Sequence, residues 1–317
     1  MNRGNQILIG VLVLQVVLGV VLFWPRQPVK AVGEPLLAGL EAEQVVRLSI
    51  RDAAGETVQL IRSGSEWVLA DTDGYPALEG VVPELLDKLV ALKGGRLVAE
   101  TEESHAQLKV AEDDYVAQVE LLLEDNSLRK LYVGSSPSYG ASHVRVAEQN
   151  EVYLVSDLSS ADVSARVSSW IDTSYLQLDA QEFVAATLEN ANGTFEFVKV
   201  GEEWTMTGLG EGETASSANI SSLISRAASV WMVRPLGTEL KPSYGFQAPN
   251  ATLVIHARSA EGTESTYTML VGAQSPDDGS YVLKSSESPY YVRVAEYTAQ
   301  DWVGETREGL LEIPDAG

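Results

Sequence analysis

The side chains best suited to catalysis are three histidines and a serine-containing turn. His105, His143 and His256 are far apart in the sequence, and no two have the spacing of a metal-binding pair. Residues 134–138 read Gly-Ser-Ser-Pro-Ser, which is not the Gly-x-Ser-x-Gly nucleophile elbow, and no strand-to-helix pattern surrounds them. A similar stretch, residues 272–276, occupies the matching place later in the chain. We therefore predict surface or strand histidines, two turns and no catalytic residue.

The acidic turns are weak candidates for a metal site, and cysteine chemistry is excluded. Residues 71–74 read Asp-Thr-Asp-Gly, a fragment of a calcium loop that lacks the third aspartate and the later bidentate glutamate. Residues 277–279 read Asp-Asp-Gly and predict a hairpin turn. The chain has no cysteine, which excludes disulfides, thiolate metal sites and cysteine nucleophiles. The sequence thus predicts no metal site, no cofactor and no enzyme activity.

Tryptophans divide into those that recur along the chain and those that do not. Trp67 and Trp204 follow a glutamate at the same place in a repeated pattern, so we predict that both pack in a core. Trp231 and Trp302 each occur once in that pattern. They are the candidates for contact with a partner, or for contact between the two copies.

A repeat of nearly constant spacing positions all of these residues. Glu66-Trp67 recurs as Glu203-Trp204, 137 positions later. Other paired positions are Val82 with Ile220, Leu86 with Ile224, Arg96 with Arg234, Leu108 with Phe246, Gly134 with Gly272, and Tyr153 with Tyr291. One spacing held through helix, loop and strand patterns indicates a duplicated domain. A motif present in both copies is more typical of residues that stabilise the fold than of catalytic residues.

Each copy predicts the same succession of elements. Alternating apolar and polar residues indicate antiparallel, half-buried strands. The pattern changes to a helical period over 79–92, before Gly94, and again over 217–229. The predicted fold class is α+β: two tandem repeats, 39–175 and 176–317, each a mainly antiparallel sheet covered by one helix.

The charge of the chain limits its partners. The net charge is −23, and the first 30 residues hold three basic side chains and no acidic one. The remainder carries 19 bases against 45 acids, which would repel phosphate backbones and anionic headgroups. We therefore predict no nucleic-acid binding. The charge serves either solubility or an acidic face for a basic partner.

The N-terminal segment predicts a membrane anchor. Residues 7–24, from Ile7 through Trp24, are apolar except for Gln15, and as a helix they span about 27 Å, close to a hydrocarbon core. Pro25 ends the helix. A cleaved signal peptide is the alternative, but no small-x-small cleavage site follows. We predict a single-pass anchor over 1–24 and a linker over 25–38.

The predicted orientation of the anchor rests on the large acidic domain that follows it, and not on the charges that flank the apolar run. Arg3 precedes the apolar run and Arg26 and Lys30 follow it, so the positive-inside rule is nearly balanced. A large acidic domain after a short N-terminal anchor is most simply exported. We predict an extracytoplasmic soluble part on the cell membrane.

Several structural motifs, taken in order, support a resemblance to a known family. They are the apolar N-terminal helix, Glu66-Trp67-Val68-Leu69, the Ala/Leu helix over 81–92, Arg96-Leu97-Val98-Ala99, the strand ends at Gly134 and Gly272, the strand over 152–155, and Tyr244-Gly245-Phe246-x-x-Pro249. In these the chain resembles the DUF4340 family, bacterial membrane-anchored proteins often encoded beside gliding-motility-type ABC transporters. The first copy departs from the family pattern, with Ala106-Gln107-Leu108 where Tyr-Gly is expected.

The resemblance implies an exported, membrane-tethered accessory protein and supplies no catalytic residues. Our leading hypothesis is a non-enzymatic accessory subunit of an ABC-transporter-like assembly, which binds a permease or an exported substrate. The alternative is a cell-surface polymer-binding or structural module independent of a transporter, because tandem repeats suit a repeated surface. A hydrolase with a site between the copies is a third hypothesis, for which the sequence offers no convergent set of polar residues.

Overall fold

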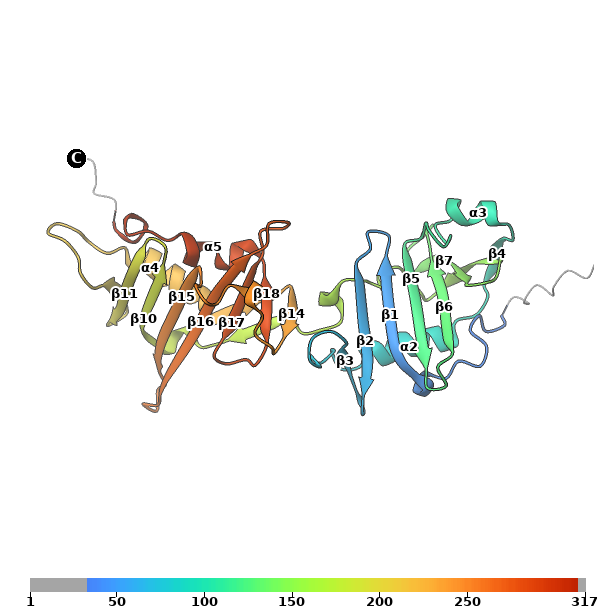
Figure 1. Cartoon of the computed structure of the whole chain (residues 1–317), viewed down its shortest axis with the longest axis horizontal. Helices are drawn as coiled ribbons and strands as arrows, with labels where there is room; N and C mark the ends of the chain where they lie inside the picture. Colours follow the sequence, from blue (N-terminus) through green and yellow to red (C-terminus); the bar gives the residue numbers. More distant parts are fainter. Residues whose placement is uncertain (1–32, 313–317) are drawn as a thin grey trace, which may run out of the picture.

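The first repeat is an antiparallel sheet of eight strands (Figure 1). The computed structural model describes residues 33–312 of the chain. The elements of the first repeat are η1 (Ala42–Gln44), β1 (Val45–Asp52), β2 (Thr57–Ser63), β3 (Glu66–Leu69), α2 (Val81–Ala91), β4 (Arg96–Ala99), α3 (Glu102–Gln107), β5 (Ala117–Leu123), β6 (Leu128–Val133), β7 (Ala141–Val146) and β8 (Val152–Ser156). The strand order is β3-β2-β1-β5-β6-β7-β8-β4, so α2 connects the two edge strands.

The second repeat has the same plan. After η2 (Val167–Ser169), its elements are β9 (Ser174–Gln177), η3 (Ala180–Glu182), β10 (Phe183–Asn190), β11 (Gly193–Val200), β12 (Glu203–Met206), α4 (Ser217–Ser225), η4 (Arg226–Ala228), β13 (Ser229–Trp231), β14 (Arg234–Gly237), η5 (Pro242–Tyr244), β15 (Ala251–Arg258), β16 (Glu264–Gln274), β17 (Tyr281–Ser285), β18 (Tyr291–Val294), α5 (Glu296–Gly304) and η6 (Glu308–Leu310). The order β12-β11-β10-β15-β16-β17-β18-β14 matches the first sheet strand for strand. The predicted tandem repeat of antiparallel sheets is confirmed.

Side-chain periodicity explains why these segments form strands and helices. Along β5, every second residue is buried, beginning with Ala117 and Val119, because alternate side chains of a strand lie on one face. In α2, Val82, Leu85, Leu86 and Leu89 are buried on one stripe, as the 3.6-residue period requires. Both segments therefore contribute one apolar face to the core of the first repeat.

The second helix is shorter than predicted. Ser216 caps α4 by accepting a hydrogen bond from the Asn219 amide at 3.4 Å. The helix ends at Ser225 rather than at 229, because the chain then enters β13, which pairs with β9 in a separate two-stranded sheet. The second repeat also gains α5, which packs against β10 and β15. The sequence pattern predicted neither α5 nor α3.

Both recurring tryptophans lie in the core, as predicted. Trp67 and Trp204 are each 7% exposed and follow the first residue of the edge strands β3 and β12. In the second repeat α4 packs against β12, the strand that carries Trp204. The tryptophans are therefore scaffold residues.

The domain boundaries need two corrections. The predicted linker, 25–38, extends too far, because Leu36 and Leu37 are buried in the first core and the Leu36 amide donates to the Leu92 carbonyl at 2.9 Å. Residues 25–32 and the predicted anchor, 7–24, lie outside the described residues. The predicted boundary at 175/176 cuts through β9, which pairs with β13 of the second repeat. Both repeats thus begin a few residues earlier than predicted.

Strand register corrects one pair of corresponding residues. Leu97 pairs with Tyr153 in the first repeat, and the matching Pro235 pairs with Val292 in the second. Tyr153 therefore corresponds to Val292, not to Tyr291. A shift of one residue moves a side chain to the other face of a sheet, and Tyr153 is 1% exposed whereas Tyr291 is only half-buried on the opposite face.

Loop geometry corrects a second pair. A Cβ on Gly134 would lie 2.2 Å from the Leu108 carbonyl oxygen, and one on Gly272 would lie 2.0 Å from the Tyr244 carbonyl oxygen. Leu108 therefore corresponds to Tyr244, not to Phe246. The next residue, Lys109, then corresponds to Gly245, and both have a left-handed backbone, with φ of 59° and 76°. The helix α3 adds residues ahead of this loop and hides the correspondence in the sequence.

The two repeats follow each other along the long axis of the molecule (Figure 1). The described chain begins at the end of the first repeat that is remote from the second, where the Gly33 amide donates to the Gly94 carbonyl at 2.8 Å. It ends on the far side of the second repeat. Within residues 33–312, no helix is both long enough and apolar enough to cross a membrane.

Candidate functional site

The serine turn and one histidine come together in the structure. Ser135 Oγ lies 3.0 Å from His143 Nδ1 and 3.2 Å from the Leu108 carbonyl oxygen, to which it can donate. Within the described chain no carboxylate hydrogen-bonds to His143, and neither residue lines the cavities between the repeats. The pair fastens the loop at Leu108 to the sheet and lacks the orienting group of a nucleophile–base system.

The other two histidines lie apart from this pair. His105 is buried, with Nε2 at 2.9 Å from the Asn150 carbonyl oxygen, and His256 is exposed, with Nδ1 at 3.1 Å from Thr266 Oγ1. In the part of the chain that the structure describes, no three His, Cys, Asp or Glu side chains are grouped so as to hold a metal ion. His143 and His256 lie in the strands β7 and β15, as predicted, whereas the prediction of a surface or strand position is wrong for His105, which is buried in the helix α3.

The acidic turn over 71–74 joins the two repeats. Asp73 has a left-handed backbone, with φ of 53°, and its Oδ2 accepts hydrogen bonds from the Thr238 amide at 2.6 Å and the Thr238 hydroxyl at 3.0 Å. These hydrogen bonds hold the pKa of Asp73 below its usual value. The turn that resembled a calcium-loop fragment thus anchors one repeat to the other.

Aromatic residues form the rest of the junction. Tyr75 of the first repeat and Tyr290 of the second meet edge to face, with ring centroids 4.8 Å apart. The Tyr75 hydroxyl donates to the Asp172 carbonyl at 3.2 Å, and the Tyr175 hydroxyl donates to the Tyr290 carbonyl at 2.9 Å. Burial raises the pKa of Tyr175 to about 12, so this hydroxyl stays a donor at physiological pH. The ring contact of Tyr75 with Tyr290 thus joins the two repeats, and the Tyr175 hydroxyl holds Tyr290 from within the second repeat.

These junction residues differ from their counterparts elsewhere in the molecule. The register of β4 and β14 places Glu100 where the second repeat has Thr238, and Glu151 where it has Tyr290. The second repeat's loop over 207–215 contains neither aspartate nor tyrosine. The duplication alone therefore does not produce the junction, which depends on residues found in one copy only.

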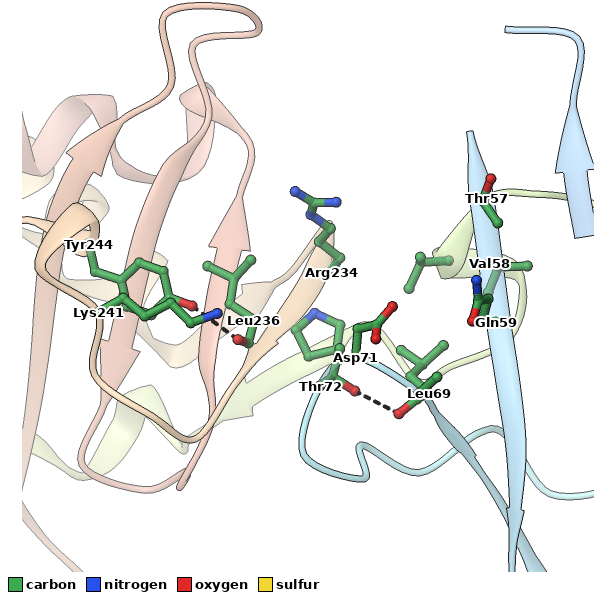
Figure 2. A pocket seen from close by; sticks show the side chains of 13 residues that line it. Thr57, Val58, Gln59, Leu69, Asp71, Thr72, Arg234, Leu236, Lys241 and Tyr244 are labelled. Atoms are coloured by element: carbon green, nitrogen blue, oxygen red, sulfur yellow. Dashed lines mark hydrogen bonds between the residues drawn. The ribbon is translucent and has the colours of Figure 1, made fainter. Parts of the chain in front are cut away.

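A cavity of about 240 Å³ opens at this junction (Figure 2). Both repeats line it. The lining residues are Thr57, Val58, Gln59, Leu69, Ala70, Asp71, Thr72 and Val167 from the side of the first repeat, and Arg234, Pro235, Leu236, Lys241 and Tyr244 from the second. Its volume is just below the usual range for ligand pockets, so it suits a small ligand or one group of a larger one.

The charges around the cavity are not paired with one another. Arg234 and Lys241 lie on the side of the second repeat and Asp71 on the side of the first (Figure 2). The ion pairs found among residues 33–312 involve other bases. A neighbouring cavity of about 300 Å³ shares Arg234 and adds Arg166. The junction thus exposes unpaired cations on a strongly acidic chain.

The sequence patterns did not reveal this set. Arg234 was recognised only as a repeated residue, and Lys241 lies just ahead of the Tyr-Gly-Phe motif without being part of it. The only available signal was that bases are scarce in this chain. Arg166, Arg234 and Lys241 could have been noted as members of that small set. That Arg234 shares one cavity with Lys241 and a neighbouring one with Arg166 depends on the packing of the two repeats.

The two tryptophans proposed for partner contact have opposite environments. Trp231 is 55% exposed at the end of β13. Trp302 is fully buried in α5, and its Nε1 donates to the Leu223 carbonyl at 3.0 Å. The prediction of partner or inter-copy contact is therefore wrong for Trp302, which fastens α5 to α4 within one repeat. For Trp231 it stays a prediction.

Fold and junction define a protein built of two tandem antiparallel sheet domains, with a small polar cavity where they meet. The family model described as "Domain of unknown function (DUF4340)" matches residues 67–230, and the chain belongs to that family. The match runs from Trp67 in β3 of the first repeat to Val230 in β13 of the second. Searches of curated proteins and of solved structures found no match.

Proposed function

We propose that this protein is a membrane-anchored, non-enzymatic accessory subunit of an ABC-transporter-like assembly. Residues 7–24 would cross the cell membrane, and the two repeats would lie on the extracytoplasmic side, each with a helix over its sheet. There they would bind a permease or a substrate that the assembly exports. Family membership is consistent with this function, but the family description assigns none.

The observation that carries the proposal is the linear arrangement of anchor end, first repeat and second repeat. Gly33 enters the fold beside Gly94, at the end of the first repeat opposite the junction (Figure 1). Only eight residues separate Trp24 from Gly33, and they span at most about 28 Å when extended. The first repeat would therefore lie close to the membrane, and the junction and second repeat would extend away from it.

The surface features favour binding over catalysis. Among the described residues, the exposed Trp231 and the junction cavity both belong to the outer part of the molecule in this arrangement. An exposed tryptophan is typical of a protein contact, because its large ring gains much when it is desolvated. We place the partner contact at Trp231.

Site-specific photocrosslinking tests this function. A photoreactive phenylalanine analogue at position 231 of the full chain, expressed in its native cells, should crosslink to a membrane protein identifiable by mass spectrometry. Tyr297, an aromatic residue that is 68% exposed on α5, is the matched control position. Crosslinks to a permease from position 231 and not from 297 support the proposal.

The same experiment separates the alternative. Crosslinks only to a cell-surface polymer, or only between copies of this chain, would favour a polymer-binding or structural module. The duplication of the sheet domain supports that second candidate, because repeated surfaces suit repeated ligands. Equal crosslinking at 231 and 297, with no defined product, would contradict both.

A further inference from the structure

The junction cavity combines features of a binding site that the proposed accessory function does not require. We propose that it binds a small ligand through one anionic group, a carboxylate or a phosphate, held by Arg234 with Lys241. The inference rests on the proposed function in one respect: the ligand would be a molecule found on the extracytoplasmic side of the membrane. The binding chemistry of the cavity does not depend on that function.

Arg234 is the cation of the cavity that is free to bind a ligand. Its guanidinium makes no hydrogen bond or ion pair within residues 33–312, whereas Lys241 Nζ lies 5.9 Å from the Tyr244 ring centroid and also interacts electrostatically with Asp73. Among residues 33–312 the ion pairs involve seven bases, and Arg234 and Lys241 are two of the several bases that take part in none. A guanidinium can donate two parallel hydrogen bonds to a carboxylate or phosphate.

The walls of the cavity suit a small organic ligand. Val58, Leu69, Pro235 and Leu236 provide apolar surface, and the Gln59 amide makes no side-chain hydrogen bond among the described residues. A volume of about 240 Å³ corresponds to roughly eight water molecules. The apolar body of a ligand would displace this water while its anionic group remained at the cations.

Charge limits the ligand to a single anionic group. Arg234 and Lys241 share the lining with Asp71, and Asp73, next to the lining residue Thr72, also attracts Lys241, so Arg234 is the base left to hold an anionic group. Salt screens charges that are more than about 8 Å from the cavity, so they contribute little to binding within it. The net charge of −23 on the whole chain would, however, repel a polyanion that extends over the protein surface. A ligand with one anionic group therefore matches the cavity.

Both repeats carry an arginine at the start of the corresponding strand, which provides a matched control. Arg96 begins β4 as Arg234 begins β14, and it lines a separate cavity of about 590 Å³ at the other end of the first repeat. That cavity is lined by residues of the first repeat alone. Arg96→Gln removes the same charge from the same place in the fold without touching the junction.

Calorimetric titration of the full chain in detergent tests the site. The probes are N-acetylalanine for a carboxylate, phenyl phosphate for a phosphate, and N-acetylalanine amide as the uncharged control. At least one anionic probe should bind saturably, the amide should not, and Arg234→Gln with Lys241→Gln should weaken binding about tenfold or more. Arg96→Gln should bind as the unaltered protein does, and near-ultraviolet circular dichroism should show that both variants are folded.

Each other outcome would overturn the assignment. Absence of saturable binding by both anionic probes, or equal weakening by Arg96→Gln, shows that the junction cavity is not an anion site. Whichever probe binds distinguishes a carboxylate from a phosphate ligand. Loss of this binding site would leave the photocrosslinking result unaffected, so the failure of this inference and of the accessory function can be told apart.

Discussion

Individual side chains in this protein have roles set by burial more than by residue type. Trp231 and Trp302 are both absent from the repeat pattern, yet one is more than half exposed and the other fully buried. Ser135 and His143 have the residue types of a catalytic pair, yet their hydrogen bonds fasten a loop to a strand. Residue type indicated candidates, and the environment of each decided its role.

The two tryptophans should respond oppositely to truncation. Trp302→Ala removes a buried ring and leaves the Leu223 carbonyl without its donor, so it should lower the free energy of unfolding by about 3–5 kcal/mol. Trp231→Ala should change it by less than about 0.5 kcal/mol, because most of that side chain is already in water. Urea unfolding followed by circular dichroism measures both. A comparable loss in the two variants would contradict the difference in burial between the two rings.

Gly134 and Gly272 permit a close backbone approach at the matching place in the two repeats. A Cβ at Gly272 would meet the Tyr244 carbonyl oxygen at 2.0 Å, and this neighbour is backbone that cannot rotate away. Gly272→Ala should therefore destabilise the protein by about 1–3 kcal/mol through overpacking. Gly304, at the end of α5, is the control, because a Cβ added there would have no atom within 4 Å, and we expect an effect near zero or slightly stabilising. Thermal unfolding of both variants decides whether the close approach matters.

The loops between strands, rather than the strands, distinguish the two repeats. The sheets share one strand order, and their central strands keep equivalent pairings, such as Leu48 with Leu121 and Ala186 with Ile255. The helix α3, the loop over 207–215 and the turn over 71–74 have no close counterpart in the other copy. Because loops bear little of the core, they can diverge without loss of the fold. The junction between repeats is built from such loops.

The contact between Asp73 and Thr238 should make the junction sensitive to acid. Hydrogen bonds from Thr238 lower the pKa of Asp73 in the folded state. A carboxylate with a lowered pKa contributes its full stabilisation above the unfolded-state pKa, about 3.9, and loses it as the pH falls through the folded-state pKa. We expect the repeats to separate more freely below about pH 4.

Fluorescence energy transfer measures this separation directly. The chain has no cysteine, so dyes attached through Glu124→Cys and Glu261→Cys, on an exposed hairpin of each repeat, label only those positions. Transfer should change on acidification in the otherwise unaltered chain. The same change should be absent in Asp73→Asn, whose amide oxygen can still accept from Thr238 but does not titrate. Identical acid responses in the two proteins would show that another group controls the junction.

The whole molecule is an elongated pair of domains whose two described ends lie far apart (Figure 1). The acidic charge is spread over both repeats, and bases line cavities both at the junction and within the first repeat. With an anchor before Gly33, the second repeat would be presented at a distance from the membrane. This arrangement suits a subunit that reaches a partner or ligand outside the bilayer.

The proposed membrane anchor over 7–24 can be tested by a substitution within it. Leu14→Lys puts a charge near the centre of the apolar run over 7–24, which costs about 2.5–3.5 kcal/mol for insertion into a membrane. The variant should move substantially from the alkaline-carbonate-resistant membrane pellet to the soluble fraction, while the unaltered chain stays in the pellet. Leu14→Val is the conservative control. Recovery of the unaltered chain in the soluble fraction, shortened at its N-terminus, would instead indicate a cleaved signal peptide.

The sequence by itself determined the duplication, the antiparallel sheets and the placement of the main helices, because the periods of strands and helices are local properties of the chain. It also identified Trp67 and Trp204 as core residues. Only the tertiary structure decided that Asp73 contacts Thr238, 165 positions away, and that Arg234 and Lys241 share a cavity with Asp71. Such contacts depend on how two folded domains pack against each other, and no local pattern records that geometry. For the same reason, the burial of Trp302 and the exposure of Trp231 became known only when the neighbours of each ring were known.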